Sequence, residues 1–573
     1  MKASPVTIPG VSSVPGKFCV LPFLHIDIQP DGKARLCAAT HEHISSAERP
    51  LSLQFDQLPE IWNSDYLREI RRKMVQGEPV GACFECYHRE SVGGVSLRNT
   101  ANKFMTARFS TLEEVWEFAS DLVERSSGYA PPPGSFQLWL GNLCNIKCRS
   151  CSGAYSSRIA ADEVHASWRG TDSQAAWTRV QALLPNRIPG SGYFGFSELL
   201  GSEGDRYRRI ISRQGGTVTF VGNGYPVTEI YISGVAEKKR RQEFRVYLND
   251  RCILSDRLDG KNWSYRVRVA AQDGYQENRQ SVLRVTSNKR GLGVSHLVVT
   301  TSATYRPLNS GVLPPRFPTA MSWHTDQGVI SSDILSCPER VRSIQFAGGE
   351  PLLSPSFVPI LERFVSGGFA KNVDIFIHAN GTLFSRKAVS LLSEFRGVML
   401  ALSLDATGSL LEYMRYPSRW DAVERNILDY AKTGLSVIVQ PTFQAYNVFG
   451  ALDVLRFCDT HNIEFHLNFL SDPQFLSTQM LPPAVVEKAI KDWERYLGLE
   501  CRESLRGKVE VALQELRRAR PPHLKQLQDE FICFTNDLDK DRNEKLGTVA
   551  PRLYQELVAA GLEFTGKHRF FSQ

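Results

Sequence analysis

Three cysteines stand close together in the segment LGNLCNIKCRSCSG, at Cys144, Cys148 and Cys151. In a reducing compartment, cysteine groups at such short spacings are typical of metal or cluster ligands rather than of disulfides. A zinc site would usually add a fourth Cys or His at matching spacing, and none lies nearby in the sequence. Three thiolates on a cubane cluster leave one iron without a protein ligand. The triplet therefore predicts a [4Fe–4S] cluster with one iron open to a substrate or cofactor.

Four further cysteines lie upstream of the triplet, at Cys19, Cys37, Cys83 and Cys86. A cluster with complete protein ligation needs four thiolates, so these residues predict a second [4Fe–4S] site. Four thiolates also suffice for a structural zinc ion, which stays open as the alternative. The other five cysteines are expected to be buried structural thiols: Cys252, Cys337, Cys458, Cys501 and Cys533.

The elements that must position the triplet show an alternating pattern. A strand is predicted at 136–140, directly before the triplet, and strands alternate with helical patterns after about residue 338. The later strand candidates are 343–346, 373–378, 398–404, 435–442 and 463–469. Six β/α units predict an α/β fold with a parallel sheet, a partial (β/α)6 TIM-like barrel. In such folds the active site forms at the carboxyl ends of the strands, where the triplet lies.

The segment 186–310 has a different character. Short runs such as TVTFV, EFRVYLN and YRVRVAA, separated by Gly, Asn and Asp, predict an inserted all-β sandwich of jelly-roll type. Between Arg187 and Arg306 it contains 20 Lys or Arg against 11 Asp or Glu, while the whole chain has a net charge of +7. This excess indicates a solvated basic surface or an anionic partner. The basic residues singled out are Lys238–Arg241, Arg245, Arg266 and Arg268.

These patterns divide the chain into five parts. They are a small Cys-rich module (1–134), the first part of the α/β core (135–185), the inserted sandwich (186–310), the second part of the core (311–500) and a C-terminal helical extension (501–573). The composition, 42% hydrophobic and 23% charged, excludes disordered and fibrous classes. No apolar run reaches the length of a membrane span or of a signal peptide, which predicts a cytoplasmic protein without a membrane partner.

The triplet and the next strand resemble the radical S-adenosylmethionine (SAM) superfamily. In that family C-x3-C-x2-C follows the first strand of a β/α barrel, as Cys144, Cys148 and Cys151 do here. The second strand ends in FAGGEP, which is similar to the family's GGEP motif and contains Gly348, Gly349 and Glu350. The resemblance implies that the glycines let the backbone approach the methionyl part of SAM and that Glu350 accepts from its ammonium group.

Later strand ends resemble the same family. Ser403 stands where the family places a serine near the SAM ribose, and Arg415 where it often uses arginine on the methionyl carboxylate. The alternatives are helix capping by Ser403 and surface solvation by Arg415. The segment IHANGT at 377–382 resembles the family's strand-end TNG element. Its His378 is expected to be packed or hydrogen-bonded rather than a catalytic base.

The N-terminal part resembles the twitch and SPASM modules that accompany some radical SAM enzymes. This resemblance implies an auxiliary [4Fe–4S] cluster on Cys19, Cys37, Cys83 and Cys86. Here the module precedes the barrel and has one cysteine where relatives often have two. The tail FTNDLDKDRNEKL looks like the terminal helix of twitch-containing relatives, and the insert weakly resembles jelly-roll modules of polysaccharide-modifying proteins.

The resemblance implies an enzyme that reductively cleaves SAM at the three-Cys cluster to a 5′-deoxyadenosyl radical, which takes hydrogen from a substrate. The auxiliary cluster would hold the substrate or accept an electron, so the net reaction would be an oxidation, a cross-link or a dehydrogenation. Family analogy points to a peptide, and the basic insert to a sugar, nucleotide-sugar or other anionic substrate. A flavodoxin or ferredoxin is the expected electron donor, and no nucleic-acid motif is present. The alternative is a non-catalytic iron–sulfur protein that transfers electrons or binds carbohydrate.

Overall fold

The computed structural model forms two compact units, which are described separately. The first contains Met1–Ile28, Lys33–Phe136 and Gln174–Val312, and the second contains Gln29–Gly32, Gln137–Ser173 and Leu313–Gln573. The structure describes residues 14–571 except 41, 47–48, 92–94, 105–110, 170–177, 185–191, 195, 201–206, 211–214, 222–226, 237–241, 259–261, 270–279, 289–291, 303–316, 326–328 and 522–523. Within this described part of the chain, no helix has the length and apolar character that a membrane crossing requires.

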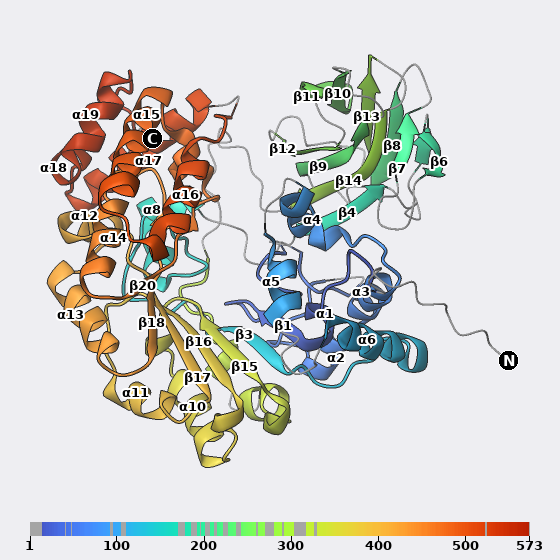
Figure 1. Cartoon of the computed structure of the whole chain (residues 1–573), viewed down its shortest axis with the longest axis horizontal. Coiled ribbons are helices and arrows are strands. Elements are labelled where there is room, and N and C mark those ends of the chain that lie inside the picture. Colours follow the sequence, from blue (N-terminus) through green and yellow to red (C-terminus); the bar gives the residue numbers. More distant parts are fainter. Residues whose placement is uncertain are drawn as a thin grey trace. The chain divides into compact units, whose positions relative to one another are not determined.

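A parallel sheet forms the centre of the second unit (Figure 1), with its strands in the order β3-β15-β16-β17-β18-β20. Neighbouring strands from β15 to β20 run parallel. The strands are β3 (Ser135–Trp139), β15 (Ser343–Ala347), β16 (Asp374–Ala379), β17 (Gly397–Leu402), β18 (Ser436–Val439) and β20 (Glu464–Phe465). The α/β class and all six predicted strand positions are therefore confirmed.

Two of the predicted strands are shorter than expected. The prediction at 435–442 is divided into β18 and β19 (Thr442–Phe443), and the prediction at 463–469 into β20 and β21 (Asn468–Phe469). Pro441 lies between β18 and β19, and a proline has no backbone N–H to donate to a neighbouring strand. Beyond it, β19 and β21 pair with each other as a separate two-stranded sheet.

Helices connect the strands and lie beside the sheet (Figure 1). They are α10 (Phe357–Ser366), α11 (Arg386–Leu392), α12 (Gly408–Met414), α13 (Trp420–Ala431) and α14 (Ala451–Thr460). Helix α10 buries Phe357, Ile360, Leu361 and Phe364 on one face. The Phe357 ring meets Phe346 of β15 edge to face, with ring centroids 5.0 Å apart. This apolar packing fixes β15, and with it the loop that follows, against the helix layer.

A C-terminal group of helices completes the second unit. It comprises α15 (Pro483–Leu499), α16 (Glu503–Leu516), α17 (Leu524–Arg542), α18 (Leu546–Val549) and α19 (Pro551–Ala559). Two short helices, α7 (Ser157–Ala160) and α8 (Glu163–Arg169), follow the cysteine triplet. Trp168 of α8 packs edge to face on Phe534 of α17 and donates to Asp537, with the indole nitrogen 3.1 Å from the carboxylate oxygen. Helix α17 is therefore packed against the segment that carries the triplet.

The N-terminal part of the first unit is mainly helical. Its elements are α1 (Leu21–Leu24), β1 (His25–Ile28), β2 (Ala34–Arg35), α2 (Leu58–Trp62), α3 (Asp65–Val75), the 3-10 turn η1 (Gly81–Cys83), α4 (Phe84–Ser91), α5 (Leu97–Phe104) and α6 (Leu112–Ser126). Arg71 of α3 is fully buried and donates to the carbonyl oxygens of Pro22, Trp62 and Gly128 at 2.8–2.9 Å. These bonds satisfy its charge and tie three separate segments together.

Two antiparallel sheets make up the rest of the first unit (Figure 1, green). One has the strand order β11-β10-β13-β8-β5, and the other β12-β9-β14-β7-β6, with β4 also paired to β14. Both sheets contribute to one hydrophobic core, in which Phe244 lies 5.1 Å from Trp263 between ring centroids. The strands are β4 (Thr178–Leu184), β5 (Gly192–Phe194), β6 (Phe196–Leu200), β7 (Tyr207–Ile210), β8 (Gly216–Val221), β9 (Val227–Ala236), β10 (Gln242–Leu248), β11 (Arg251–Leu258), β12 (Asn262–Arg268), β13 (Gln280–Ser287) and β14 (Leu292–Ser302).

The sheets differ from the expected insert in one respect. Strand β4 begins at Thr178, before the predicted boundary at 186, and belongs to the sheet through its pairing with β14. Of the basic residues singled out in the sequence, Arg245 belongs to β10, and Arg266 and Arg268 belong to β12. Lys238–Arg241 lie outside the described residues.

Helix α4 contacts the second of these sheets. The ring of Phe84 lies 6.1 Å from the ring of Tyr231 on β9, measured between centroids. The Ser91 hydroxyl donates to the Ser264 hydroxyl on β12 at 3.1 Å. Because Phe84 stands between Cys83 and Cys86 in the sequence, the C-x-x-C segment is in contact with the β sheets.

Candidate functional site

The cysteine triplet lies on the loop that leads from β3 to α7. Cys144 is buried and Cys148 and Cys151 are half-buried. The loop is held by backbone hydrogen bonds from Lys147 N to Tyr416 O, at 2.6 Å, and from Arg149 N to Met414 O, at 2.8 Å. Burial raises the pKa of Cys148 to about 12 and also raises the pKa of Cys144. These thiols are therefore neutral at pH 7 unless a cationic group such as a metal cluster binds them.

The GGEP loop after β15 packs directly on the backbone of the cysteine loop. Glu350 N donates to Leu143 O at 2.8 Å. Gly348 has a φ of +128°, and a Cβ atom at Gly349 would lie 2.2 Å from Leu143 O. Only glycine permits this approach. The glycines thus allow the two loops to pack closely together. Their expected contact with SAM remains a prediction.

Glu350 is 2% exposed and its carboxylate accepts two backbone hydrogen bonds. The donors are Asn380 N, at 2.7 Å, and Leu352 N, at 3.1 Å. Burial raises the pKa of Glu350 to about 7, although both hydrogen bonds and the charge of Arg415 act in the opposite direction. The carboxylate is thus costly to ionise in the free protein and would gain from a cationic ligand.

Asn380, from the IHANGT segment, connects Glu350 to the cysteine loop. Its side-chain nitrogen donates to Asn145 Oδ1 at 2.9 Å and lies 3.9 Å from Cys144 Sγ. Asn145 in turn donates to Thr382 Oγ1 at 2.8 Å. Sequence reasoning identified this segment but did not assign Asn380 to the site. Its position one residue after buried Ala379, at the end of the third strand, was the feature of the sequence that indicated a place in the site.

Arg415 is 7% exposed, which rules out surface solvation as its role. Its Nη1 donates to Asp405 Oδ2 at 2.9 Å, and its positive charge acts on the thiols of Cys144 and Cys148. Asp405 is itself buried and accepts from Thr442 N at 2.8 Å. Sequence reasoning did not assign Asp405 to the site. Asp405 lies before α12 and Arg415 directly after it, so their pairing depends on the course of this helix, which the sequence did not define.

Ser403 and His378 complete the predicted positions. Ser403 is half-buried after β17, and its N–H donates to Ala379 O at 2.9 Å. It does not cap α12, because the N-cap residue of that helix is Thr407. His378 Nε2 lies 2.8 Å from the side-chain nitrogen of Gln345, and burial lowers the pKa of His378 to about 4. His378 is thus packed and hydrogen-bonded, as expected.

The four upstream cysteines line one pocket in the first unit, together with Leu21, Ala39, Ala82, Leu97 and Arg98. Burial raises the pKa of Cys37 to about 12 and raises the pKa of Cys19, Cys83 and Cys86, and the four thiols repel one another when ionised. Throughout the described residues, no three His, Cys, Asp or Glu side chains form a group that could hold a metal ion. The four thiols share the lining of one pocket, and the choice between an iron–sulfur cluster and a zinc ion stays a prediction.

The scattered cysteines only partly match the prediction of buried thiols. Cys458 is buried, but Cys252 is exposed, and Cys337, Cys501 and Cys533 are half-buried. The prediction was wrong for Cys252 because it lies on β11, the edge strand of its sheet, where one side lacks a neighbouring strand.

Comparison with known proteins identifies one part of the chain. Residues 329–446 match the model of the Radical SAM superfamily. No curated protein matches the chain. Among solved structures, SuiB of Streptococcus suis bound to S-adenosylmethionine is 16% identical over 29% of this chain and 37% of SuiB, with a TM-score of 0.23.

Two further solved structures are similar to parts of the chain. The anSMEcpe structure with bound AdoMet and Kp18Cys peptide is 18% identical over 28% of this chain and 50% of its own, with a TM-score of 0.24. A family 35 carbohydrate binding module from Clostridium thermocellum is 13% identical over 21% of this chain and 96% of its own, with a TM-score of 0.16. The chain thus spans half or less of the length of the SuiB and anSMEcpe structures that it matches.

Proposed function

We propose that this chain, which contains a Radical SAM domain, reductively cleaves SAM at a [4Fe–4S] cluster on Cys144, Cys148 and Cys151 and removes hydrogen from a substrate. The observation that carries the proposal is the convergence of two buried polar pairs on the cysteine loop. Glu350 with Asn380 lies beside Cys144, and Arg415 with Asp405 acts on Cys148. Bound at this loop, the cluster and SAM would supply the electron transfer and the radical that abstracts hydrogen.

The protein's own contribution is to hold the two charged ends of an amino acid. In the proposal, Glu350 accepts from the methionyl ammonium, whose positive charge offsets the cost of ionising a buried carboxyl group. Arg415 binds the methionyl carboxylate while Asp405 holds its guanidinium in place. Ser403, at the end of β17, is assigned to the ribose. The joined GGEP and cysteine loops keep these groups in fixed positions before SAM arrives.

We further propose that Cys19, Cys37, Cys83 and Cys86 bind an auxiliary [4Fe–4S] cluster in a twitch- or SPASM-like module. Their shared pocket supports this assignment, because four thiolates in one lining can ligate a cubane completely. With such a cluster the reaction would be an oxidation, a cross-link or a dehydrogenation. The proposed substrate is a peptide or a sugar-type molecule, with an anionic group that suits the basic segment between Arg187 and Arg306. A flavodoxin or ferredoxin would donate the electron.

The test is anaerobic reconstitution with iron and sulfide, followed by reduction in the presence of SAM. The wild-type protein should release 5′-deoxyadenosine. The triple variant Cys144→Ala/Cys148→Ala/Cys151→Ala should release none and contain about four fewer iron atoms per chain. Cys252→Ala, which removes an exposed thiol from β11, is the matched control and should keep the wild-type iron content and activity. Unchanged iron in the triple variant would show that these cysteines are not the ligands. A wild-type protein with both clusters and no 5′-deoxyadenosine would favour a non-catalytic electron carrier.

A further inference from the structure

Helix α5 begins directly beside one of the pocket cysteines. Leu97 and Arg98, in the first turn of this helix, line the pocket together with Cys86. Ser96 precedes the helix, and its N–H donates to Asn99 Oδ1 while Asn99 N donates to Ser96 Oγ, both at 3.1 Å. The Ser96 hydroxyl donates to Glu90 Oε1, so these contacts fix the start of α5 and with it the Arg98 side chain at the pocket.

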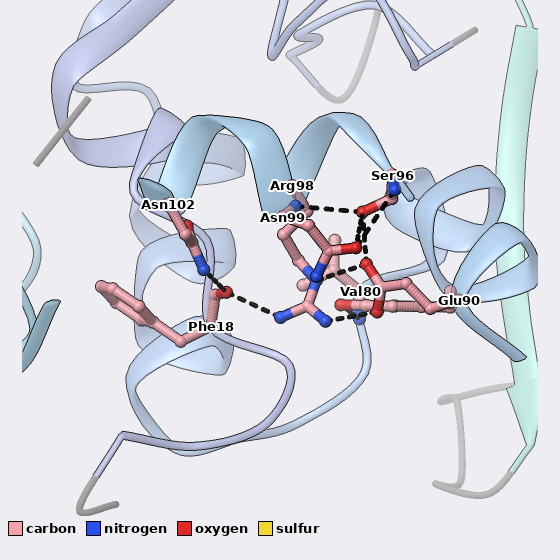
Figure 2. Close-up of polar contacts among 8 residues, drawn as sticks. Phe18, Val80, Glu90, Ser96, Arg98, Asn99 and Asn102 are labelled. Carbon is pink, nitrogen blue, oxygen red and sulfur yellow. Dashed lines mark hydrogen bonds and ion pairs between the residues drawn. The ribbon is translucent and has the colours of Figure 1, made fainter. Parts of the chain in front are cut away.

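The Arg98 side chain brings a positive charge to the same pocket. Arg98 is only 8% exposed, and its guanidinium donates to both carboxylate oxygens of Glu90 and to Phe18 O, the last at 2.9 Å (Figure 2). Its charge stabilises the ionised forms of Cys19, Cys83 and Cys86. Glu90 acts against ionised Cys86. The pocket thus has one buried cation in its lining, and that cation is paired with a half-buried carboxylate.

We infer that Arg98 raises the reduction potential of the auxiliary cluster, while Glu90 lowers it and holds the guanidinium in place. This inference rests on the proposed function, which assigns the pocket to that cluster. Reduction adds one negative charge inside the pocket. A nearby cation and hydrogen bonds to the ligand sulfurs stabilise the more negative state and so favour uptake of the electron. The effect is strong because the pocket is shielded from water.

A purely mechanical role for Arg98 is the competing explanation, since the side chain also ties α5 to the segment before Cys19. Asn102, one turn further along α5, offers the means to separate the two roles. Its side chain donates to Phe18 O at 2.9 Å (Figure 2). It also accepts from Val20 N at 3.0 Å. Asn102 therefore holds the same segment without contributing a charge. A change at Asn102 disturbs the mechanical connection alone.

The test measures the midpoint potential of the auxiliary cluster by spectroscopic redox titration. The parent protein carries Cys144→Ala/Cys148→Ala/Cys151→Ala, so that only the upstream cluster contributes a signal. Arg98→Gln should lower the potential and Arg98→Lys should restore it in part. Glu90→Gln should raise the potential. For each charge change we expect at least a tenfold change in the ratio of reduced to oxidised cluster, about 59 mV for one electron. Asn102→Ala should leave the potential unchanged.

The outcomes distinguish this inference from the function on which it rests. A parent that binds no iron, or binds zinc, overturns the auxiliary cluster and this inference with it. A parent with four upstream iron atoms whose potential is the same in Arg98→Gln and Glu90→Gln, or shifts in the same direction in both, overturns this inference alone. If Arg98→Gln fails to hold the cluster, the rise expected for Glu90→Gln and the smaller fall expected for Arg98→Lys decide the question.

Discussion

Glu350 is a buried carboxyl group, and its burial determines whether the proposed affinity for SAM rises or falls with pH. In the free protein its pKa is raised to about 7, so it is largely protonated below that pH. Binding of the SAM ammonium needs the ionised form and would lower the pKa in the complex. Affinity is therefore lost as the pH falls through 7 and is regained as it rises. The same raised pKa means that the folded protein without SAM loses stability as the pH rises from the ordinary carboxyl range to 7.

We expect SAM to bind the reconstituted protein about tenfold more tightly at pH 8 than at pH 6. Isothermal titration calorimetry across this range measures the change. Glu350→Gln should bind SAM more weakly and remove the pH dependence between 6 and 8. Glu362→Gln, which alters an exposed carboxylate paired with Lys387, serves as control and should retain it. An affinity that is constant across the range in the wild-type protein would contradict the assignment of Glu350.

Asp405 makes a second prediction at this scale. Asp405→Ala leaves the buried guanidinium of Arg415 without its partner, 2.9 Å away in the wild-type protein. Loss of one member of a buried ion pair costs about 3–5 kcal/mol of unfolding free energy. Urea unfolding of the apoprotein measures this cost. The control Asp429→Ala breaks an exposed pair with Lys432 and should cost less than about 1 kcal/mol. Equal effects of the two changes would show that the Arg415 charge does not depend on Asp405.

Glu350 and Arg415 were singled out through the family resemblance, Glu350 after β15 and Arg415 directly after α12. The structure places both in the interior beside the cysteine loop. Asn380 and Asp405 were not assigned to the site, because an Asn or Asp in a loop is usually a turn residue. Their task depends on contacts across the fold, from Asn380 to Cys144 and from Asp405 to Arg415.

At the scale of elements, the cysteine loop depends on the C-terminal helices. Arg149, between Cys148 and Cys151, is fully buried, and its guanidinium donates to Asp539 on α17 at 2.7 Å and to Glu544 just beyond it at 2.9 Å. Its carbon centre lies 3.5 Å from the ring centre of Tyr413. The hydroxyl of Tyr413 donates to Asp539 at 2.7 Å. Helix α17 therefore holds the loop that carries the triplet.

Arg149→Met should destabilise the second unit by about 3–5 kcal/mol, because it leaves Asp539 and Glu544 without their shared cation. It should also lower the iron bound at the triplet, which iron analysis in a background lacking the four upstream cysteines would measure. Arg158→Met is the matched control, since Arg158 is exposed on α7 and donates to Asn145 O. Normal iron content and stability in Arg149→Met would show that α17 does not support the loop.

The strands of the parallel sheet were predictable because their apolar residues alternate or run continuously between clear turn signals. In β16, for example, Ile375, Ile377 and Ala379 are buried in alternation. Strand β4 was not predicted as part of the β sheets. Its partner, β14, lies more than a hundred residues later in the sequence, so local pattern could not reveal the pairing.

At the scale of the whole molecule, the chain divides differently from the order of its sequence. The β sheets group with the N-terminal helices in the first unit, and the proposed SAM site lies entirely within the second. Phe84 of α4 contacts Tyr231 of β9, so the sheets pack against the N-terminal helices. The first unit is thus not continuous in the sequence, because residues 137–173, which lie between two of its parts, belong to the second unit.

Removal of residues 174–312, with a short Gly/Ser linker, should leave a protein that still cleaves SAM, because the residues of the proposed SAM site all lie in the second unit. Size-exclusion chromatography and the 5′-deoxyadenosine assay measure the two properties. The deletion uncovers Phe84, so Phe84→Ser in the shortened chain should reduce any self-association. A shortened chain that is monomeric and binds iron but cannot cleave SAM would contradict this division of labour.

The contact of Gly349 with Leu143 has a consequence for the proposed cluster site. The two loops are joined by direct backbone contacts, and Asn380 adds a side-chain link between them. Burial raises the pKa of Cys144 and Cys148, so both are thiols at neutral pH, and a thiol is far less prone to oxidation than a thiolate. In the proposed function, the cluster would therefore bind at two loops that the chain's own contacts hold together.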